Sequence, residues 1–303
     1  MSEVPAKVQK ANPDGYVHAR DPNEYQRLRD QALMWQRATE EVLDRIGLKA
    51  GMSCLDVGSG PGSVMRLMAN RVGPQGQVTG IEIDGNLANQ ALADLRAQGG
   101  ANFQVVVANA LKLESVPGAP FDLTFCRLFL MHMQNPVAAL ERMLFWTKPG
   151  GTVVAQEFDF GAIAVEPRCP AMTEFNRLFE GVFRGYGRNL RAGRQLPAQF
   201  EAAGLGLPDG TLAEAKYLPL KDMAQMLIGF TKGCSPRPPS LALPTRSAPI
   251  SSRSTWWRRR RMGATIASPP SSSPPGSALR DNIVIRTPCH ARFSLRAIGL
   301  PLI

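Results

Sequence analysis

The stretch LDVGSGPGS, from Leu55 to Ser63, decides the fold of this chain. It begins in an apolar segment and then places glycine at every second position, at Gly58, Gly60 and Gly62. The apolar pattern predicts a buried strand from Ser53 to Val57 and a helix from Ser63 to Arg71. Glycines between a strand and a helix allow a tight backbone turn and the close approach of a ligand. We therefore predict a ligand-binding turn at the carboxyl end of this strand.

The alternation of strand and helix continues along the chain. Helical patterns occur at 87–95 and 135–145, and further strands are predicted at 77–83, 103–107, 121–125, 151–157 and 211–218. Apolar strands that alternate with helices are typical of a parallel sheet that is covered on both faces. Because connections between parallel strands are right-handed, the predicted fold class is a doubly wound, mostly parallel α/β sheet.

A long helix precedes this sheet and is predicted to cover it. Asp21 is a candidate N-cap, Pro22 suits the first turn, and Glu24 completes a capping box. Apolar residues then recur at helical spacing up to Ile46. The predicted parts are an N-terminal segment with the covering helix (1–48), an α/β domain (49–235) with a cofactor half (49–160) and a helical substrate cap (165–205), and a tail (236–303).

Two kinds of ligand suit a glycine turn of this type, a dinucleotide or S-adenosylmethionine. Asp56 favours the second, because its carboxylate would repel a pyrophosphate and attract the ammonium group of a methionine moiety. Glu82 ends the second predicted strand, where it is placed to accept hydrogen bonds from both ribose hydroxyls, although this feature also suits NAD. Asn109 and Ala110 end the third strand, where a short polar side chain reaches an adenine amino group.

Five motifs in order resemble those of a known family: LDVGSGPG, VTGIEID, VVANALKL, FDLTFCRLFLMHMQNP and KPGGTVVAQEFD. The family is that of the class I S-adenosylmethionine-dependent methyltransferases, and the chain is most similar to its small-molecule branch of the ubiquinone/menaquinone-biosynthesis type. The likeness runs from residue 15 to residue 220. It implies a Rossmann-like sheet with strand order 3-2-1-4-5-7-6, an antiparallel last strand, and S-adenosylmethionine as the cofactor.

The resemblance also implies which residues bind the cofactor. Asp56 and the glycine turn match the positions that hold the methionine end, while Glu82 matches the ribose-binding acid. Asn109 stands where most members have Asp, and its neutral side chain keeps an acceptor and adds a donor. The full predicted set is Asp56, Gly58, Ser59, Gly60, Gly62, Glu82, Ile83, Asn109, Ala110 and Arg127.

Methyl transfer is an in-line displacement at a sulfonium methyl group, so catalysis depends mainly on positioning and desolvation. A base is needed only if the acceptor must lose a proton. His132 is the candidate base, because its ordinary pKa suits that role, and the alternative is a packed helix residue. Glu157 is a candidate substrate contact. Tyr16 and His18 are candidates for closing over the cofactor.

The residues just after the fourth predicted strand favour a small organic acceptor. CRLF, at 126–129, stands where an N-P-P-Y tetrad is expected in many enzymes that methylate adenine bases or glutamine amides. Three other functions stay open. They are a nucleic-acid methyltransferase that uses the basic tail, a cofactor-binding protein without turnover, and an NAD-linked oxidoreductase, which the glycine spacing disfavours.

The tail, residues 236–303, carries the whole net charge of +10, with eleven Arg, no Lys and a single acid, Asp281. It also holds eleven Pro and eleven Ser, and it lacks apolar periodicity apart from NIVIR at Asn282–Arg286. Such a composition buries too little surface to offset its ordering entropy. We predict either a disordered arm or the product of a frameshift near residues 232–236, and no final strand after Cys234.

The sequence also bears on location and on metals. MSEVPAKVQKANPDG, the first fifteen residues, lacks the apolar stretch of a signal peptide, and no run approaches the ~18 apolar residues that span a bilayer. Five cysteines are scattered without C-x-x-C spacing, which argues against a zinc site and a disulfide framework. We predict a cytoplasmic protein without a metal or a membrane span, and leave its oligomeric state open.

Overall fold

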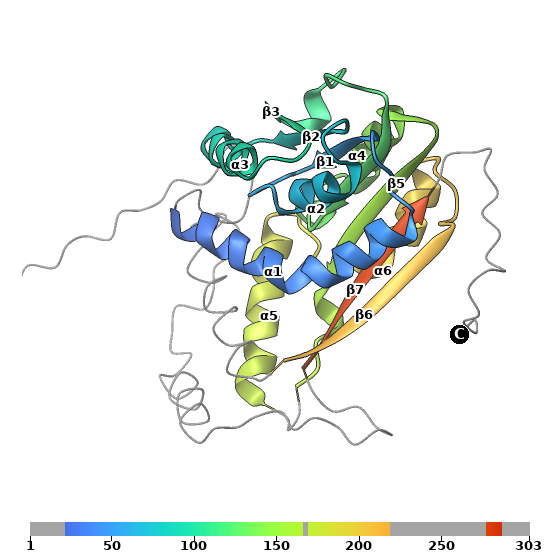
Figure 1. The fold of residues 1–303 in the computed structure, drawn as a ribbon. Helices are drawn as coiled ribbons and strands as arrows, with labels where there is room; N and C mark the ends of the chain where they lie inside the picture. Colours follow the sequence, from blue (N-terminus) through green and yellow to red (C-terminus); the bar gives the residue numbers. More distant parts are fainter. Residues whose placement is uncertain (1–21, 166–168, 219–276, 287–303) are drawn as a thin grey trace, which may run out of the picture.

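The computed structural model describes residues 22–165, 169–218 and 277–286, which together form a seven-stranded sheet with helices on both faces (Figure 1). The strand order is β3-β2-β1-β4-β5-β7-β6. Neighbours from β3 to β5 are parallel, and β7 is antiparallel to both β5 and β6. The strands are β1 (Ser53–Val57), β2 (Gln77–Glu82), β3 (Asn102–Val107), β4 (Phe121–Arg127), β5 (Thr147–Asp159), β6 (Gly210–Leu218) and β7 (Ser277–Arg286). The predicted fold class and strand order are confirmed.

The two faces of the sheet pack against different helices. Because successive side chains of a strand point to opposite faces, Cys54 of β1 joins a cluster with Leu43 and Met68, while Leu55 joins one with Leu140. The helical members of the first cluster come from α1, α2 and α3, and those of the second come from α4 and α6. In the described residues the helices are α1 (Pro22–Arg45), α2 (Ser63–Val72), α3 (Gly85–Gln98), α4 (Pro136–Phe145), α5 (Pro170–Gly185), α6 (Ala192–Ala202) and the 3-10 turns η1 (Ala110–Lys112), η2 (Leu130–His132) and η3 (Phe160–Ala162).

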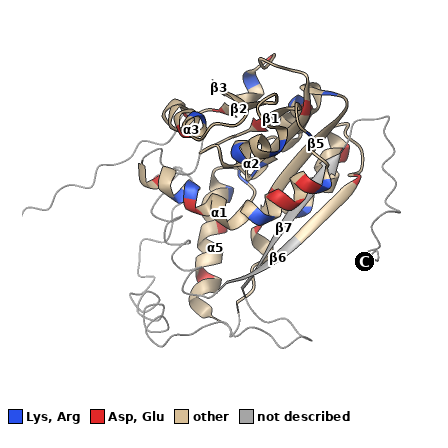
Figure 2. Ribbon diagram, viewed as in Figure 1, with Lys and Arg blue, Asp and Glu red and all other residues tan. Residues whose placement is uncertain are grey.

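The predicted covering helix is present as α1, although its candidate cap Asp21 lies outside the described residues. Figure 2 shows acidic and basic residues interspersed along α1, and Arg45 binds Glu41 one turn away at 2.6 Å. The opposite face is buried, with Trp35 and Val42 at the interface. The Thr39 hydroxyl donates a hydrogen bond to Gln156 Oε1 of β5 at 2.8 Å. This contact ties the covering helix directly to β5.

The prediction that no strand follows Cys234 is wrong. Ser277–Arg286 forms β7, which pairs with β5 from Val153 to Asp159 and with β6 along the whole of that strand. A strand inserted between two others gains main-chain hydrogen bonds on both edges, and composition does not reveal that gain. The remaining residues of the tail lie outside the described part of the chain.

Candidate functional site

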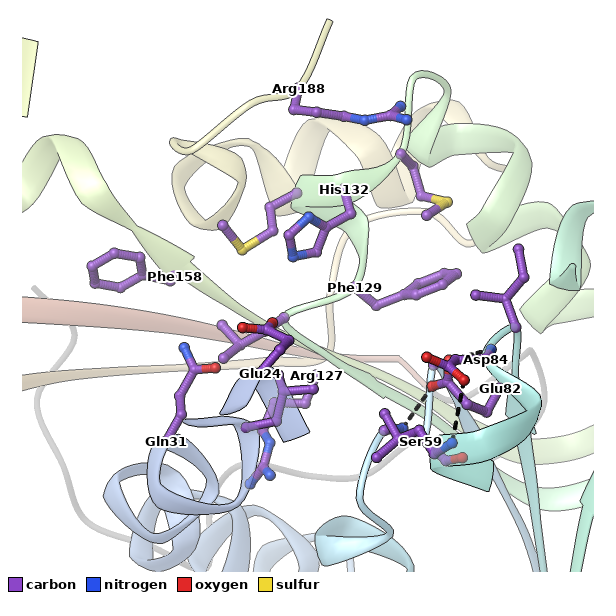
Figure 3. A pocket seen from close by; sticks show the side chains of 18 of the residues that line it. Glu24, Gln31, Ser59, Glu82, Asp84, Arg127, Phe129, His132, Phe158 and Arg188 are labelled. Carbon is purple, nitrogen blue, oxygen red and sulfur yellow. Dashed lines mark hydrogen bonds between the residues drawn. The ribbon is translucent and has the colours of Figure 1, made fainter. Parts of the chain in front are cut away.

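A cavity of about 870 Å³ opens at the carboxyl ends of β1, β2 and β4, between the strand ends and the helices α1 and α5 (Figure 3). We distinguish two sides of it. The glycine-turn side consists of Asp56, Gly58, Ser59, Gly60, Glu82, Ile83, Asn109 and Ala110. The aromatic side consists of Trp35, His132, Phe158, Phe160, Phe179, Phe183 and Arg188. Figure 3 shows Ser59 and Glu82 on one side of the cavity, and His132 and Arg188 on the other.

The glycine turn is fixed to the neighbouring strand through its backbone. The amides of Gly58 and Ser59 donate to the Ile81 carbonyl at 2.9 and 3.0 Å. Gly58 has φ +75°, and a Cβ there would lie 2.5 Å from the ring of Phe129. A Cβ on Gly60 would meet no atom within 4 Å, so this glycine leaves open space beside the backbone. The turn is therefore rigid, and its bare backbone faces the cavity.

Gly62 has a different role from its neighbours. It does not line the cavity, and a Cβ there would lie 2.9 Å from Leu95 Cδ1 of α3. The close neighbour of Gly62 is therefore a helix that packs beside α2, and not a ligand in the cavity. Since Gly62 also has φ +77°, it lets α2 begin against α3 without strain.

Asp56 is a buried acid at the base of the cavity, with only 1% of its surface exposed. Its Oδ2 forms no hydrogen bond within the described residues. Desolvation raises the pKa of Asp56 from 3.8 to about 7, Arg127 lowers it and Glu82 raises it further. A buried oxygen without a donor is costly, so this site suits a ligand with a positively charged donor.

Glu82 holds the turn and borders the cavity at the same time. Its Oε2 accepts from the Gly60 amide and its Oε1 from the Asp84 amide, both at 2.9 Å. Burial raises the pKa of Glu82, while the two amides oppose that rise. A carboxylate has about four lone-pair sites. Two hydroxyl groups of a ligand therefore still find acceptors on Glu82.

Asp84 was not among the predicted site residues, although it lines the cavity. Its Oδ1 caps α3 by accepting from the amides of Asn86 and Leu87 at 2.9 and 3.2 Å, and its Oδ2 accepts from the Tyr25 hydroxyl at 2.6 Å. The Tyr25 contact fastens the covering helix to the rim of the cavity. The sequence signal was an acid directly before a helix, which by itself indicates only a cap.

The side chains expected at an adenine all line the cavity. Ile83 is 39% exposed, which leaves its apolar surface open to a flat partner. Asn109 accepts from the Leu111 amide through Oδ1 at 2.9 Å and thereby caps η1. This bond fixes the orientation of the side chain, and the amide group of Asn109 keeps its donors. Ala110 is buried beside it.

Arg127 ends β4 and links the sheet to the cover. Its Nη1 donates to Thr39 Oγ1 of α1 at 3.0 Å. The charge of Arg127 also lowers the pKa of Asp56, so it favours the ionised form of that acid.

His132 lies in the cavity, but its environment differs from the one we expected. Burial, followed by the charges of Arg188 and Arg27, lowers its pKa to about 3. The imidazole is therefore neutral at neutral pH, and it is a weaker base than the ordinary pKa implied.

Glu157 lies behind the cavity wall rather than in it. It is 0% exposed and does not line the cavity. Its Oε1 accepts from the amides of Phe129 and Leu130 at 2.8 and 2.6 Å, and burial raises its pKa to about 7. In this place Glu157 fixes the backbone that leads to His132. The buried position of Glu157 therefore does not support the predicted contact with a substrate.

Ten of the twelve predicted site residues line one cavity, and Gly62 and Glu157 do not. Tyr16 and His18 lie outside the described residues. Phe179 and Phe183 of α5 lie in the predicted substrate cap (165–205), but they were not named as site residues, because an apolar stripe on a helix ordinarily indicates a core. Within the described residues, no group of three or more His, Cys, Asp or Glu side chains is placed to hold a metal ion.

A family model described as "Methyltransferase domain" matches residues 48–200, which is half of the chain. The chain belongs to the class I methyltransferases. An uncharacterized methyltransferase of Schizosaccharomyces pombe is 33% identical over 149 residues, covering 47% of this chain and 52% of that protein. A demethylmenaquinone methyltransferase of Geobacillus kaustophilus is 28% identical over 152 residues, covering 50% of this chain and 59% of that protein. This methyltransferase chain thus spans about half the length of the curated relatives it matches.

Solved structures support the same fold. The YcgJ protein of Bacillus subtilis has a TM-score of 0.51 at 15% identity, covering 84% of this chain and 100% of that one. The predicted membership of the S-adenosylmethionine-dependent methyltransferase family is confirmed. No helix in the described parts of this methyltransferase has the length and apolar character needed to cross a bilayer.

Proposed function

We propose that this protein transfers a methyl group from S-adenosylmethionine to a small organic acceptor. The observation that carries the proposal is the glycine-turn side of the cavity. There an open backbone turn, a buried Asp56 oxygen without a hydrogen bond in the described chain, and the Glu82 carboxylate of the adjacent strand border the same space. The Asp56 oxygen suits the ammonium group of the proposed cofactor, and the Glu82 carboxylate suits its ribose hydroxyls.

Each residue of the glycine-turn side would have a separate task. Asp56 would accept hydrogen bonds from the ammonium group, and Glu82 would accept them from the ribose hydroxyls. Ile83 would pack against adenine, and Asn109 would donate to its ring nitrogens or accept from its amino group. The backbone of Gly58, Ser59 and Gly60 would pass closest to the methionine end.

When bound, S-adenosylmethionine supplies a methyl group on a positively charged sulfur, and a nucleophilic atom of the acceptor can attack the carbon of that methyl group. The chain mainly positions the two reactants and excludes water, because the cavity lies between the carboxyl ends of the strands and the helices α1 and α5. The neutral His132 would accept a hydrogen bond from a hydroxyl or amine of the acceptor. Its low pKa makes full proton transfer to it expensive, which suits an acceptor that is already nucleophilic.

The other functions that the sequence left open have no specific support from the described residues. The nucleic-acid alternative depends on the basic tail, of which only Ser277–Arg286 is described. A cytoplasmic location stays a prediction made from the sequence.

Calorimetry with S-adenosylhomocysteine tests the proposal. The full chain is expected to bind this product, and Glu82→Ala is expected to lose about 1–3 kcal/mol of binding free energy, because the ribose hydroxyls lose their acceptor. Glu82→Gln keeps one acceptor oxygen and is expected to lose less. Glu201→Ala, which removes an exposed carboxylate of α6, is the matched control. Absence of binding to the folded parent chain would contradict the proposal.

A further inference from the structure

Phe129 stands at the border between the two sides of the cavity. Figure 3 shows its ring between Glu82 and His132. Leu128 packs against the buried cluster of the aromatic side, whereas Phe129, the next residue, packs against the cluster that contains Leu55 of β1. If this protein binds S-adenosylmethionine as proposed, the sulfonium group lies near this border, because the methyl group must pass from the glycine-turn side to the acceptor.

The ring of Phe129 lies directly on the bare backbone of the glycine turn. A Cβ on Gly58 would lie 2.5 Å from Phe129 Cδ2, 3.2 Å from Cγ and 3.3 Å from Cε2. Phe129 is also half-buried and lines the cavity, so part of its ring rests on Gly58 and part faces the open space. The ring therefore forms a wall of the space in which the turn would hold the methionine end of the cofactor.

The backbone that carries this ring has an unusual conformation. Leu128 has φ +52°, and within the described residues it is the one non-glycine residue with a positive φ. Such residues are strained, and they persist where the surrounding structure enforces the conformation. The Leu128 amide donates to the Gln156 carbonyl of β5 at 2.9 Å. The strain therefore lies at the residue that turns the chain between the end of β4 and Phe129.

Buried hydrogen bonds hold Phe129 in place after this turn. Its amide donates to Glu157 Oε1 at 2.8 Å, and its carbonyl accepts from the His132 amide at 3.0 Å. Glu157 Oε1 also accepts from the Leu130 amide at 2.6 Å. Glu157 is fully buried in β5 and does not line the cavity, so it acts on the site through these two amides. Together these contacts stabilise the strained turn at Leu128 and fix the position of the ring.

A fixed phenyl ring can distinguish the two forms of the cofactor. The faces of a benzene ring carry negative charge density and attract a cation that lies within about 6 Å. S-adenosylmethionine has a positively charged sulfonium group, whereas S-adenosylhomocysteine has a neutral thioether at the same place. Asp56 and Glu82 would bind the ammonium and ribose groups, which both forms share. A ring at the border is therefore suited to recognise the difference between them.

We propose that Phe129 binds the sulfonium group of S-adenosylmethionine through a face of its ring, and that Glu157 is the positioning residue that holds this ring at the border. The contact favours the charged methyl donor over the neutral product. It therefore helps the product to leave and the next donor to bind.

Calorimetry on the full chain, with S-adenosylmethionine and S-adenosylhomocysteine as separate ligands, tests this inference through the ratio of their dissociation constants. Phe129→Leu keeps an apolar side chain and removes the ring, and it is expected to shift the ratio about fivefold in favour of S-adenosylhomocysteine. Phe129→Tyr keeps a ring face and is expected to retain most of the preference. An unchanged ratio in Phe129→Leu would overturn the inference and leave the proposed function standing. A folded parent chain that binds neither ligand would contradict both.

Further variants locate the effect. Phe145→Leu is the matched control, because Phe145 is 68% exposed at the end of α4 and does not line this cavity. It is expected to leave the ratio unchanged, and a shift equal to that of Phe129→Leu would contradict the assignment. Glu157→Ala is expected to shift the ratio in the same direction as Phe129→Leu. Glu157→Gln keeps an acceptor oxygen for the two amides and is expected to shift it less, whereas equal ratios in the parent chain and Glu157→Ala would overturn the positioning role.

If these variants do not fold, the parent chain still decides. S-adenosylmethionine that is isotope-labelled in its methyl group gives a separate methyl signal in NMR spectra of the full chain. The ring current of an aromatic face moves the signal of a methyl group above it upfield. The bound methyl signal is therefore expected upfield of that of the free ligand, and a bound signal without an upfield shift would overturn the inference.

Discussion

The two sides of the cavity differ in how the chain builds them. The glycine-turn side is made of residues at the carboxyl ends of β1, β2 and β3, and hydrogen bonds from its backbone amides to the neighbouring strand β2 hold it. The aromatic side is assembled from α1, β5 and α5, segments far apart in the sequence, and ring contacts hold it. The first side carries the acids Asp56 and Glu82, and the second carries Arg188. The difference predicts that substitutions and pH act on the two sides separately.

Gly58→Ala is expected to have the largest effect. The added Cβ would lie 2.5 Å from the ring of Phe129 in a backbone with φ +75°, so strain and overpacking combine to about 2–4 kcal/mol of unfolding free energy. Gly150→Ala is the matched control, because Gly150 has φ +80° and no atom within 4 Å of an added Cβ. Urea titration of both variants measures the difference. Equal losses would show that backbone strain alone acts at Gly58.

Asp56→Asn is expected to remove a pH dependence that is confined to the glycine-turn side. Burial raises the pKa of Asp56 to about 7, whereas an ammonium ligand favours its ionised form. Binding below that pKa must therefore release a proton, and the affinity of the parent chain for S-adenosylhomocysteine rises with pH, by up to about tenfold per unit, until about pH 7. The variant is expected to bind more weakly and without this slope. A parallel slope in the variant would assign the titration to another group.

The same burial has a consequence for stability. Because the folded chain binds the Asp56 proton more tightly than the unfolded chain does, the stability from this group is complete below its ordinary pKa of 3.8. It is lost as the pH rises through about 7. Asp56→Asn therefore gains stability relative to the parent chain over that interval, which urea titration at several pH values can follow.

The smallest effect is expected on the aromatic side. The pKa of His132 is about 3, so the imidazole does not change its charge near neutrality. Between about pH 6 and about pH 8, the pH profile of the affinity for S-adenosylhomocysteine is expected to differ by less than about twofold between the parent chain and His132→Gln. A step near the ordinary histidine pKa that disappears in His132→Gln would show that the imidazole is not buried as described.

Local patterns were sufficient to predict most of the glycine-turn side. Gly58, Gly60 and Glu82 lie at strand ends, and strand ends of a parallel sheet meet at one edge whatever the details of packing. Burial was harder to foresee, because it depends on which segments cover a side chain. His132 illustrates this point. Burial, followed by the charges of Arg188 and Arg27, lowers its pKa, and the fold brings these two arginines near it from distant parts of the sequence.

The aromatic side and β7 could be predicted only in part, for a related reason. Phe179 and Phe183 form an apolar stripe on α5, which looks the same whether it faces a core or a cavity. Glu157 ends a predicted strand, as a ligand-binding acid does, yet its side chain turns to two backbone amides of the neighbouring loop. Ser277–Arg286 pairs with partners on both edges, and the apolar pattern NIVIR at Asn282–Arg286 marks only the second half of this strand.

The position of β7 has a consequence for how the chain is made. β7 lies between β5 and β6 although it comes after both in the sequence. Every described residue that borders the cavity precedes residue 191, so the ribosome releases the described part of the binding site well before it releases residues 277–286. During that interval β5 has one unpaired edge and β6 has no partner on either edge, so their free amides and carbonyls are open to pairing with another nascent chain. Synthesis of residues 277–286 therefore supplies the strand that joins β6 to the rest of the sheet.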